Sequence, residues 1–221
     1  MSLLVAALGV AATSLAATGG GGAGGGGAAG STPVRAGIVS VAESQVGYRT
    51  SPAGTYCNRY SAYWDAGTGN CGPGLRSEEW CADFAAWVWR QAGAPLTYAL
   101  ASGDLNAAAA SFYVWAEDHG TWHPAGEGYQ PRPGDVAVYG LDPADDVATH
   151  VAVVTGYTPG QRGPDVVNGD GDHTGFSVVE TGTDQYRADA SGRESKSVLS
   201  GYASPIVPGT AAASGARTRA A

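Results

Sequence analysis

The chain has 221 residues, and its 20 acidic side chains outnumber the 12 basic ones, which gives a formal net charge of -8. A nucleic-acid-binding surface needs clustered basic residues to neutralise phosphates, so this balance argues against that class of protein. The length suits one domain, because residues 18–31 have the composition of a flexible Gly/Ala-rich linker and residues 209–221 that of a small, polar tail. We expect a single globular domain over residues 32–208.

Residues 1–17 are apolar and small, and this stretch is too short to span a bilayer comfortably. Its length is typical of the apolar region of a secretory signal peptide, and Ser14-Leu15-Ala16 offers a small-residue cleavage site. The basic residues that usually precede such a region are missing. An apolar tail or a short anchor is the alternative, but we expect export, with no membrane span after cleavage of the signal.

The first expected element of the domain is a helix. Thr32-Pro33 predicts its start, since proline at the first helical position wastes no hydrogen bond, and Gly47 predicts its end. Residues 48–76 are rich in Gly, Pro, Asn and Tyr without an apolar period. They predict an ordered loop rather than a helix or a strand.

Two more helices are expected before the chain changes character. One starts near Trp80-Cys81, with apolar positions at helical spacing, and ends at Gly93. The other begins around Asp104, runs through the segment AAAASFYVWAEDHG and stops at Gly120. The helical part of the domain therefore lies in the first half of the sequence.

Segments with strand patterns follow Pro131. They are PRPGDVAVYG (a turn and a strand), HVAVVTGY, PDVVNGDG, FSVVETG and residues 197–207. The polar, Gly-rich stretch between the first two is typical of a hairpin connection. Helices followed by strands of antiparallel character predict an α+β fold.

The three cysteines are Cys57, Cys71 and Cys81. In an oxidising compartment an odd count leaves one thiol free or paired between chains. The loop between Cys57 and Cys71 has little apolar periodicity and is the kind of segment that a disulfide would hold. We therefore predict a Cys57–Cys71 disulfide and a free Cys81.

Cys81 is the candidate nucleophile because it lies at the start of a predicted helix. The unpaired N–H groups of a first helical turn favour negative charge and hence a thiolate. A packed core thiol is the alternative, since cysteine is commonly buried. Cysteine catalysis also requires a base and a third group that orients the base.

His150 is the candidate base. It opens a strongly apolar strand, from which a polar side chain would be excluded unless it had a role. Asn168 and Asp170 end the next strand, and either side chain can accept a hydrogen bond from an imidazole N–H. Capping, turn or surface positions account for the other histidines, which are His119, His123 and His173.

Four runs of the sequence together resemble one protein family: WCADFAAWVWRQAGA, RPGDVAVYG, HVAVV and VVNGDG. They are similar to the CHAP family, the cysteine- and histidine-dependent amidohydrolases/peptidases, which is related to the NlpC/P60 cell-wall hydrolases. The resemblance covers roughly residues 36–207. It implies a papain-like fold, in which N-terminal helices pack on an antiparallel β-sheet.

The resemblance also implies the roles of individual residues. Cys81 matches the family's nucleophile and His150 its general base. Asn168 falls on the position that often holds Glu in the family, and Asp170 falls on the family's Asn. Either could orient the histidine, so all four residues are catalytic candidates.

Two neighbours of Cys81 are candidates for the substrate cleft. Trp80 would wall the cleft beside the thiol, with core packing as an equal alternative. Asp83 would complement the helix dipole from the first turn, with a solvated carboxylate as its alternative. The cysteines and histidines lack zinc-ligand spacing, and NGDGDHTG lacks the acidic twelfth position of an EF-hand loop. We therefore expect no metal and no cofactor.

The function that the resemblance implies is hydrolysis of peptidoglycan. We expect a secreted, cell-wall-associated, monomeric amidase or endopeptidase that cleaves stem peptides through a Cys-His-Asn thiolate mechanism. A catalytically silent wall-binding or regulatory domain is the first alternative. A secreted cysteine peptidase that acts on proteins is the second.

Overall fold

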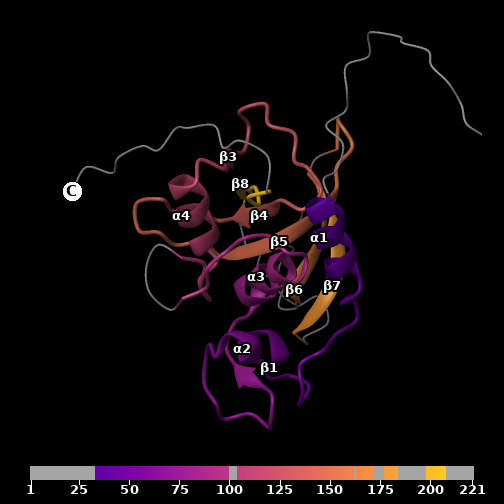
Figure 1. Cartoon of the computed structure of the whole chain (residues 1–221), viewed down its shortest axis with the longest axis vertical. Helices are drawn as coiled ribbons and strands as arrows, with labels where there is room; N and C mark the ends of the chain where they lie inside the picture. Colours follow the sequence, from indigo (N-terminus) through magenta and orange to yellow (C-terminus); the bar gives the residue numbers. More distant parts are fainter. Residues whose placement is uncertain (1–32, 100–103, 162, 172–176, 184–197, 208–221) are drawn as a thin grey trace, which may run out of the picture. The chain divides into compact units, whose positions relative to one another are not determined.

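The computed structural model describes residues 33–99, 104–161, 163–171, 177–183 and 198–207 (Figure 1). All of them fall within one unit of the chain, Ser31–Ala221. The expected signal peptide, linker and tail lie outside the described residues. In the described part of the chain, no helix has both the length and the apolar composition needed to cross a membrane.

A six-stranded sheet carries the fold. Its strands in chain order are β3 (Trp122–Pro124), β4 (Val136–Tyr139), β5 (His150–Gly156), β6 (Asp165–Gly171), β7 (Val178–Thr183) and β8 (Leu199–Ala203). Across the sheet their order is β3-β8-β4-β5-β6-β7, and each pair of neighbours is antiparallel. β4 and β5 form the predicted hairpin, in which Val138 lies opposite Val151.

Helices precede and cover this sheet. They are α1 (Pro33–Glu43), α2 (Arg59–Trp64), α3 (Cys81–Gln91) and α4 (Ser111–Asp118). α3 packs on β5 and β6, α1 contacts α3 and β5, and α4 contacts β3, β4 and β8 (Figure 1). The predicted α+β class, with helices packed on an antiparallel sheet, is confirmed.

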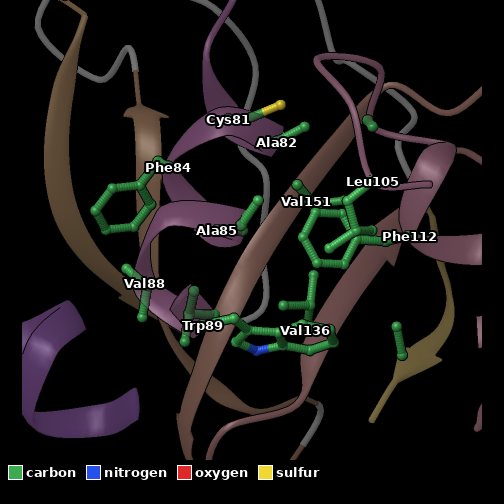
Figure 2. Close-up of a cluster of buried hydrophobic side chains, with 14 of the residues drawn as sticks. Cys81, Ala82, Phe84, Ala85, Val88, Trp89, Leu105, Phe112, Val136 and Val151 are labelled. Atoms are coloured by element: carbon green, nitrogen blue, oxygen red, sulfur yellow. The ribbon is translucent and has the colours of Figure 1, made fainter. Parts of the chain in front are cut away.

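The hydrophobic core lies between α3 and the sheet (Figure 2). Phe84 and Trp89 of α3 are fully buried and belong to the same cluster as Val136 of β4 and Val151 of β5. Each fully buried side chain of this size contributes about 1.5–3 kcal/mol to folding. Cys81 lies at one end of the cluster and Trp89 at the other (Figure 2), so the core holds the helix that carries the candidate nucleophile.

The prediction that residues 48–76 form only a loop was wrong. They contain α2 and a two-stranded ribbon of β1 (Cys57–Asn58) and β2 (Arg76–Ser77). Elements this short have no apolar period that a sequence pattern could reveal. Asn58 begins α2 as its N-cap, because its side-chain oxygen accepts a hydrogen bond from the N–H of Ser61 at 2.8 Å.

Two further expectations need correction. The third helix begins at Ser111 rather than near Asp104. Asn106 explains the difference: its side-chain oxygen accepts from the N–H of Ala108 at 2.8 Å, and such local bonds compete with helix formation. His123, expected in a turn, lies in β3.

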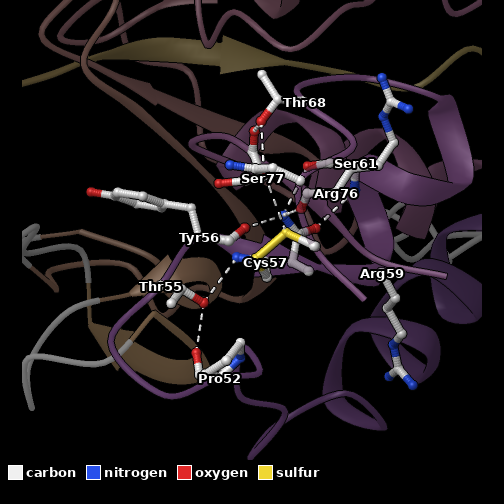
Figure 3. The surroundings of a disulfide bond; sticks show 12 residues. Pro52, Thr55, Tyr56, Cys57, Arg59, Ser61, Thr68, Arg76 and Ser77 are labelled. Atoms are coloured by element: carbon white, nitrogen blue, oxygen red, sulfur yellow. Dashed lines mark hydrogen bonds between the residues drawn. A yellow bond between two sulfur atoms is a disulfide. The ribbon is translucent and has the colours of Figure 1, made fainter. Parts of the chain in front are cut away.

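Cys57 and Cys71 form the predicted disulfide (Figure 3). Their Cα atoms are 5.8 Å apart, a usual separation for such a bond. The Thr55 hydroxyl supports the backbone here, accepting from the N–H of Cys57 at 3.3 Å and donating to the Pro52 oxygen at 2.6 Å. The disulfide closes the segment that carries α2, which packs on α3, and Cys81 is left as the free thiol.

Candidate active site

A carboxylate from the sheet fixes the backbone where α3 begins. Trp80, the residue before Cys81, makes no capping bond with its side chain. Its N–H instead donates to Oδ2 of Asp170 on β6, at 3.0 Å. The hydroxyl of Ser177 donates to Oδ1 of Asp170 and accepts from the indole N–H of Trp80. Asp170 therefore ties the start of α3 to β6.

The Cys81 thiol is 8% exposed and neutral at rest. Burial raises its pKa, the charge of Asp170 raises it further, and hydrogen bonds from the backbone N–H groups of Val151 and Ala82 act in the opposite direction. The result is a pKa raised to about 12. The first turn of α3 thus favours a thiolate, as expected, but burial outweighs this effect.

His150 is the first residue of β5 and is 3% exposed. Burial lowers the pKa of its imidazole to about 4, although the hydrogen bond to Asn168 acts in the opposite direction. Nε2 lies 3.0 Å from Oδ1 of Asn168. Because an amide oxygen only accepts, Nε2 carries the hydrogen and Nδ1 carries the lone pair. Asn168 therefore holds a neutral ring in the tautomer that a general base requires.

An irregularity in β6 gives Asn168 and Asp170 different partners. The register between β6 and β7 shifts between Asn168 and Gly171, and Asp170 has a left-handed φ of 59°. Asn168 bonds His150, while Asp170 bonds the N–H of Trp80. The geometry therefore favours Asn168 as the residue that orients the histidine, a choice that the sequence left open.

Gly169, between these two polar residues, lets β6 pass close to α3. A Cβ at this position would lie 2.4 Å from Cβ of Phe84, closer than side chains approach. The run Asn-Gly-Asp therefore consists of a packing glycine and two polar residues with separate partners.

Val151 links the Cys81 thiol to the strand that carries His150. It follows His150 in β5, and its N–H hydrogen-bonds to the Cys81 sulfur. The register pairs described between β5 and β6 begin at Val153–Val167, so this ladder stops short of Val151. The thiol therefore bonds the peptide group that follows His150, at the start of β5.

Trp80 and Asp83, expected to line the substrate cleft, are both fully buried. Trp80 stacks on Tyr60 with ring centroids 5.2 Å apart, so it packs in the core. Asp83 lies in the first turn of α3, as expected, but it is no solvated carboxylate: its Oδ1 accepts from the hydroxyl of Tyr98. A side chain without exposed surface cannot line a cleft in this structure, so the burial argues against the cleft role of both.

Sequence reasoning missed three residues of this region: Glu78, Tyr98 and Ser177. Glu78 hydrogen-bonds to Asp83, and the other two belong to segments without any motif. Glu78 alone had a signal in the sequence, because it lies three residues before Cys81 in the run EEWCADF. Only the folded chain brings Tyr98 and Ser177 to the site.

Two of the remaining histidines have packing roles. Nδ1 of His119 lies 2.7 Å from the Trp115 oxygen at the end of α4, and the His123 ring stacks on Tyr129 at 3.8 Å. His173 lies outside the described residues. Within the ranges that the structure describes, no group of three or more His, Cys, Asp or Glu side chains could hold a metal ion.

A cysteine at the start of a helix, a histidine on the sheet beneath it and an asparagine that holds the histidine define the papain-like class of site. A family model described as CHAP domain matches residues 72–176, a segment that contains Cys81, His150 and Asn168. This match agrees with the family resemblance of the sequence, and a CHAP domain suggests amidase or peptidase activity on peptidoglycan. No curated protein and no solved structure matches the chain.

Proposed function

We propose that this protein is an exported peptidoglycan hydrolase that cleaves amide bonds of stem peptides with Cys81 as nucleophile. One observation carries the proposal: the Cys81 sulfur accepts the N–H of Val151, next to His150, whose Nε2 is held by Asn168. The CHAP domain supplies the substrate class. The bond cleaved is either that between sugar and alanine or one within the peptide or cross-bridge.

The reaction starts from a neutral pair, because a pKa of about 12 for Cys81 and of about 4 for His150 leave both groups uncharged at neutral pH. The thiol proton therefore moves to Nδ1 of His150 as the sulfur attacks the carbonyl carbon. The carbonyl oxygen becomes an oxyanion, which the N–H of Cys81 at the helix start stabilises. His150 then gives the proton to the leaving amine, and a thioester remains.

Water completes the cycle. His150 takes a proton from a water molecule while the water oxygen adds to the thioester carbonyl carbon, and the C–S bond then breaks. The sulfur regains the proton, and the product leaves as a carboxylic acid. Asn168 holds the Nε2–H of His150 throughout, so Nδ1 remains the nitrogen that exchanges protons.

Release of soluble fragments from purified peptidoglycan tests the proposal. Cys81→Ser and His150→Ala should each reduce the rate by about a thousandfold or more, with unchanged far-UV circular dichroism. His119→Ala is the matched control, since this histidine is exposed at the end of α4. Mass spectrometry of the fragments assigns the bond, and undiminished release by Cys81→Ser would remove Cys81 as the nucleophile.

The low exposure of Cys81 favours a second candidate, a catalytically silent wall-binding domain. A thiol that is 8% exposed and has a raised pKa is a poor nucleophile until a substrate or a movement uncovers it. Wild type and Cys81→Ser that both bind insoluble peptidoglycan and both release nothing would support this candidate. Release by the wild type alone supports the hydrolase.

The apolar stretch of residues 1–17 supports export. N-terminal sequencing of protein recovered outside the cell should then find a mature chain that starts near residue 18. Recovery of the full-length chain only inside the cell would contradict this part of the proposal.

A further inference from the structure

Two carboxyl groups that the mechanism does not use lie together beside the first turn of α3, those of Glu78 and Asp83. Their side chains hydrogen-bond to each other. Two ionised carboxylates cannot do this, because both only accept. Glu78 Oε1 and Asp83 Oδ2 are buried, and apart from this mutual contact neither oxygen has a hydrogen-bond partner among the described residues. One proton held between the two carboxyl groups satisfies both oxygen atoms.

The surroundings of Asp83 explain why this proton has to come from Glu78. Asp83 is fully buried, and Tyr98 donates to its other carboxylate oxygen, Oδ1. Arg76 attracts Glu78 electrostatically, but its guanidinium pairs with Asp65 at 2.9 Å. Without Glu78 as a donor, Oδ2 of a buried carboxylate would have no partner, which is strongly unfavourable.

We propose that Glu78 is a positioning residue for Cys81: it donates its carboxyl proton to Asp83 and so allows Asp83 to be buried in the first turn of α3. The backbone oxygen of Asp83 also accepts from the indole of Trp64, at 3.0 Å. Donors from Glu78, Tyr98 and Trp64 therefore fix the turn that carries the thiol. The consequence for catalysis rests on the proposed function, in which Cys81 attacks an amide.

The proton on Glu78 is retained at neutral pH and lost in mildly alkaline solution. Burial, followed by the hydrogen bond to Asp83 and its charge, raises the pKa of Glu78 to about 8, against the lowering effect of Arg76. Above that pH the two carboxylates repel each other and Asp83 loses a donor, so the turn loosens. Tyr98 and Cys81, which also face Asp83, stay protonated there because burial raises the pKa of each.

Two substitutions of Glu78 separate a proton donor from a mere space filler. A glutamine amide donates to Asp83 at every pH, whereas alanine donates nothing. At neutral pH, Glu78→Gln should hydrolyse peptidoglycan within about threefold of wild type, and Glu78→Ala should lose about tenfold or more. Between neutral pH and about pH 9 the wild type should lose activity as Glu78 ionises, and Glu78→Gln should not. Glu79→Gln changes an exposed neighbour and should follow the wild type throughout.

A ¹³C NMR titration of the glutamate carboxyl carbons tests the shared proton without any activity, in full-length Cys81→Ser protein. One resonance should titrate near pH 8, and it should be absent from the same protein carrying Glu78→Gln. Ordinary titration of every glutamate would overturn the proposal. So would a Glu78→Gln enzyme that is as impaired at neutral pH as Glu78→Ala.

A cation bound between the carboxylates is the rival explanation for two buried oxygen atoms without a donor. Calcium or magnesium chloride would then raise the thermal unfolding midpoint of the wild type but not of Glu78→Gln, and this result would also overturn the proposal. If the wild type releases no fragments, the proposed function fails, but the titration still decides whether Glu78 and Asp83 share a proton.

Discussion

Asn168→Ala separates the orientation of the base from the reactivity of the thiol. The substitution removes the acceptor of the Nε2–H of His150, which lies 3.0 Å from the amide oxygen. His150 is 3% exposed, so water does not readily replace this acceptor. An unpaired buried donor costs about 1–3 kcal/mol, which corresponds to a loss of roughly five- to 150-fold in kcat/KM if the cost falls on the transition state. We expect the loss in kcat, with little change in KM.

Asn168→Asp should shift the pH dependence of activity in a defined direction. A carboxylate keeps the acceptor but favours the imidazolium, so it should raise the pKa of His150 from its value of about 4. The base is inactive when protonated, so activity falls as the pH drops through this pKa. The acid limb of kcat/KM should therefore move up by about one pH unit or more, measured with a soluble peptidoglycan fragment. NMR titration of His150 in Cys81→Ala protein checks the assignment.

Asp170→Asn is the matched control, because Asp170 accepts from the N–H of Trp80, whereas Asn168 holds His150. It should leave the titration of His150 close to that of the wild type. Two results would refute the reasoning. One is a kcat/KM of Asn168→Ala within twofold of wild type, and the other is a shift of the His150 titration by Asp170→Asn in place of Asn168→Asp.

Three stability measurements test other parts of the structure. Between pH 6.5 and pH 4 the unfolded chain binds a proton at His150 that the folded chain does not bind. Urea titrations should therefore show the free energy of unfolding falling by about 3 kcal/mol as the pH drops over this range. A His150→Gln variant should lack this loss. Gly169→Ala should lower the free energy of unfolding by about 1–3 kcal/mol because the new Cβ meets Phe84, whereas Gly72→Ala, with open space around it, should not. Cys57→Ser should lower it by about 3 kcal/mol through loss of the disulfide, which non-reducing peptide mapping should first show to be intact in the wild type. An unchanged free energy in any of the three would contradict the contact concerned.

The longer elements could be predicted from the sequence because they carry their own pattern. α3 has apolar residues at helical spacing, and β5 is an apolar run bounded by a polar turn. α2 and β3 could not be predicted, since six and three residues are too few to show a period. The start of α4 was mispredicted because Asn106 forms a local bond that outweighs the helix propensity of the alanines that follow it.

The site could be predicted as far as its motifs reach. Cys81, His150 and Asn168 lie in runs that resemble one family, and the structure brings them to the same end of β5. Their protonation could not be predicted, because it depends on burial by segments far away in the sequence. The hydrogen bond between Trp80 and Ser177, which lie 97 residues apart in the sequence, could not be predicted for the same reason.

The burial that makes Cys81 a weak nucleophile at rest also protects the disulfide of the same chain. Disulfide exchange requires a thiolate, and at neutral pH a thiol with an ordinary pKa is a few per cent ionised. With a pKa of about 12, the thiolate fraction of Cys81 is roughly 3,000-fold smaller. The Cys57–Cys71 bond can therefore persist beside an odd thiol. The thiol attacks a substrate carbonyl only where His150 can take the thiol proton during the attack. The geometry at the end of β5 therefore decides what the thiol reacts with.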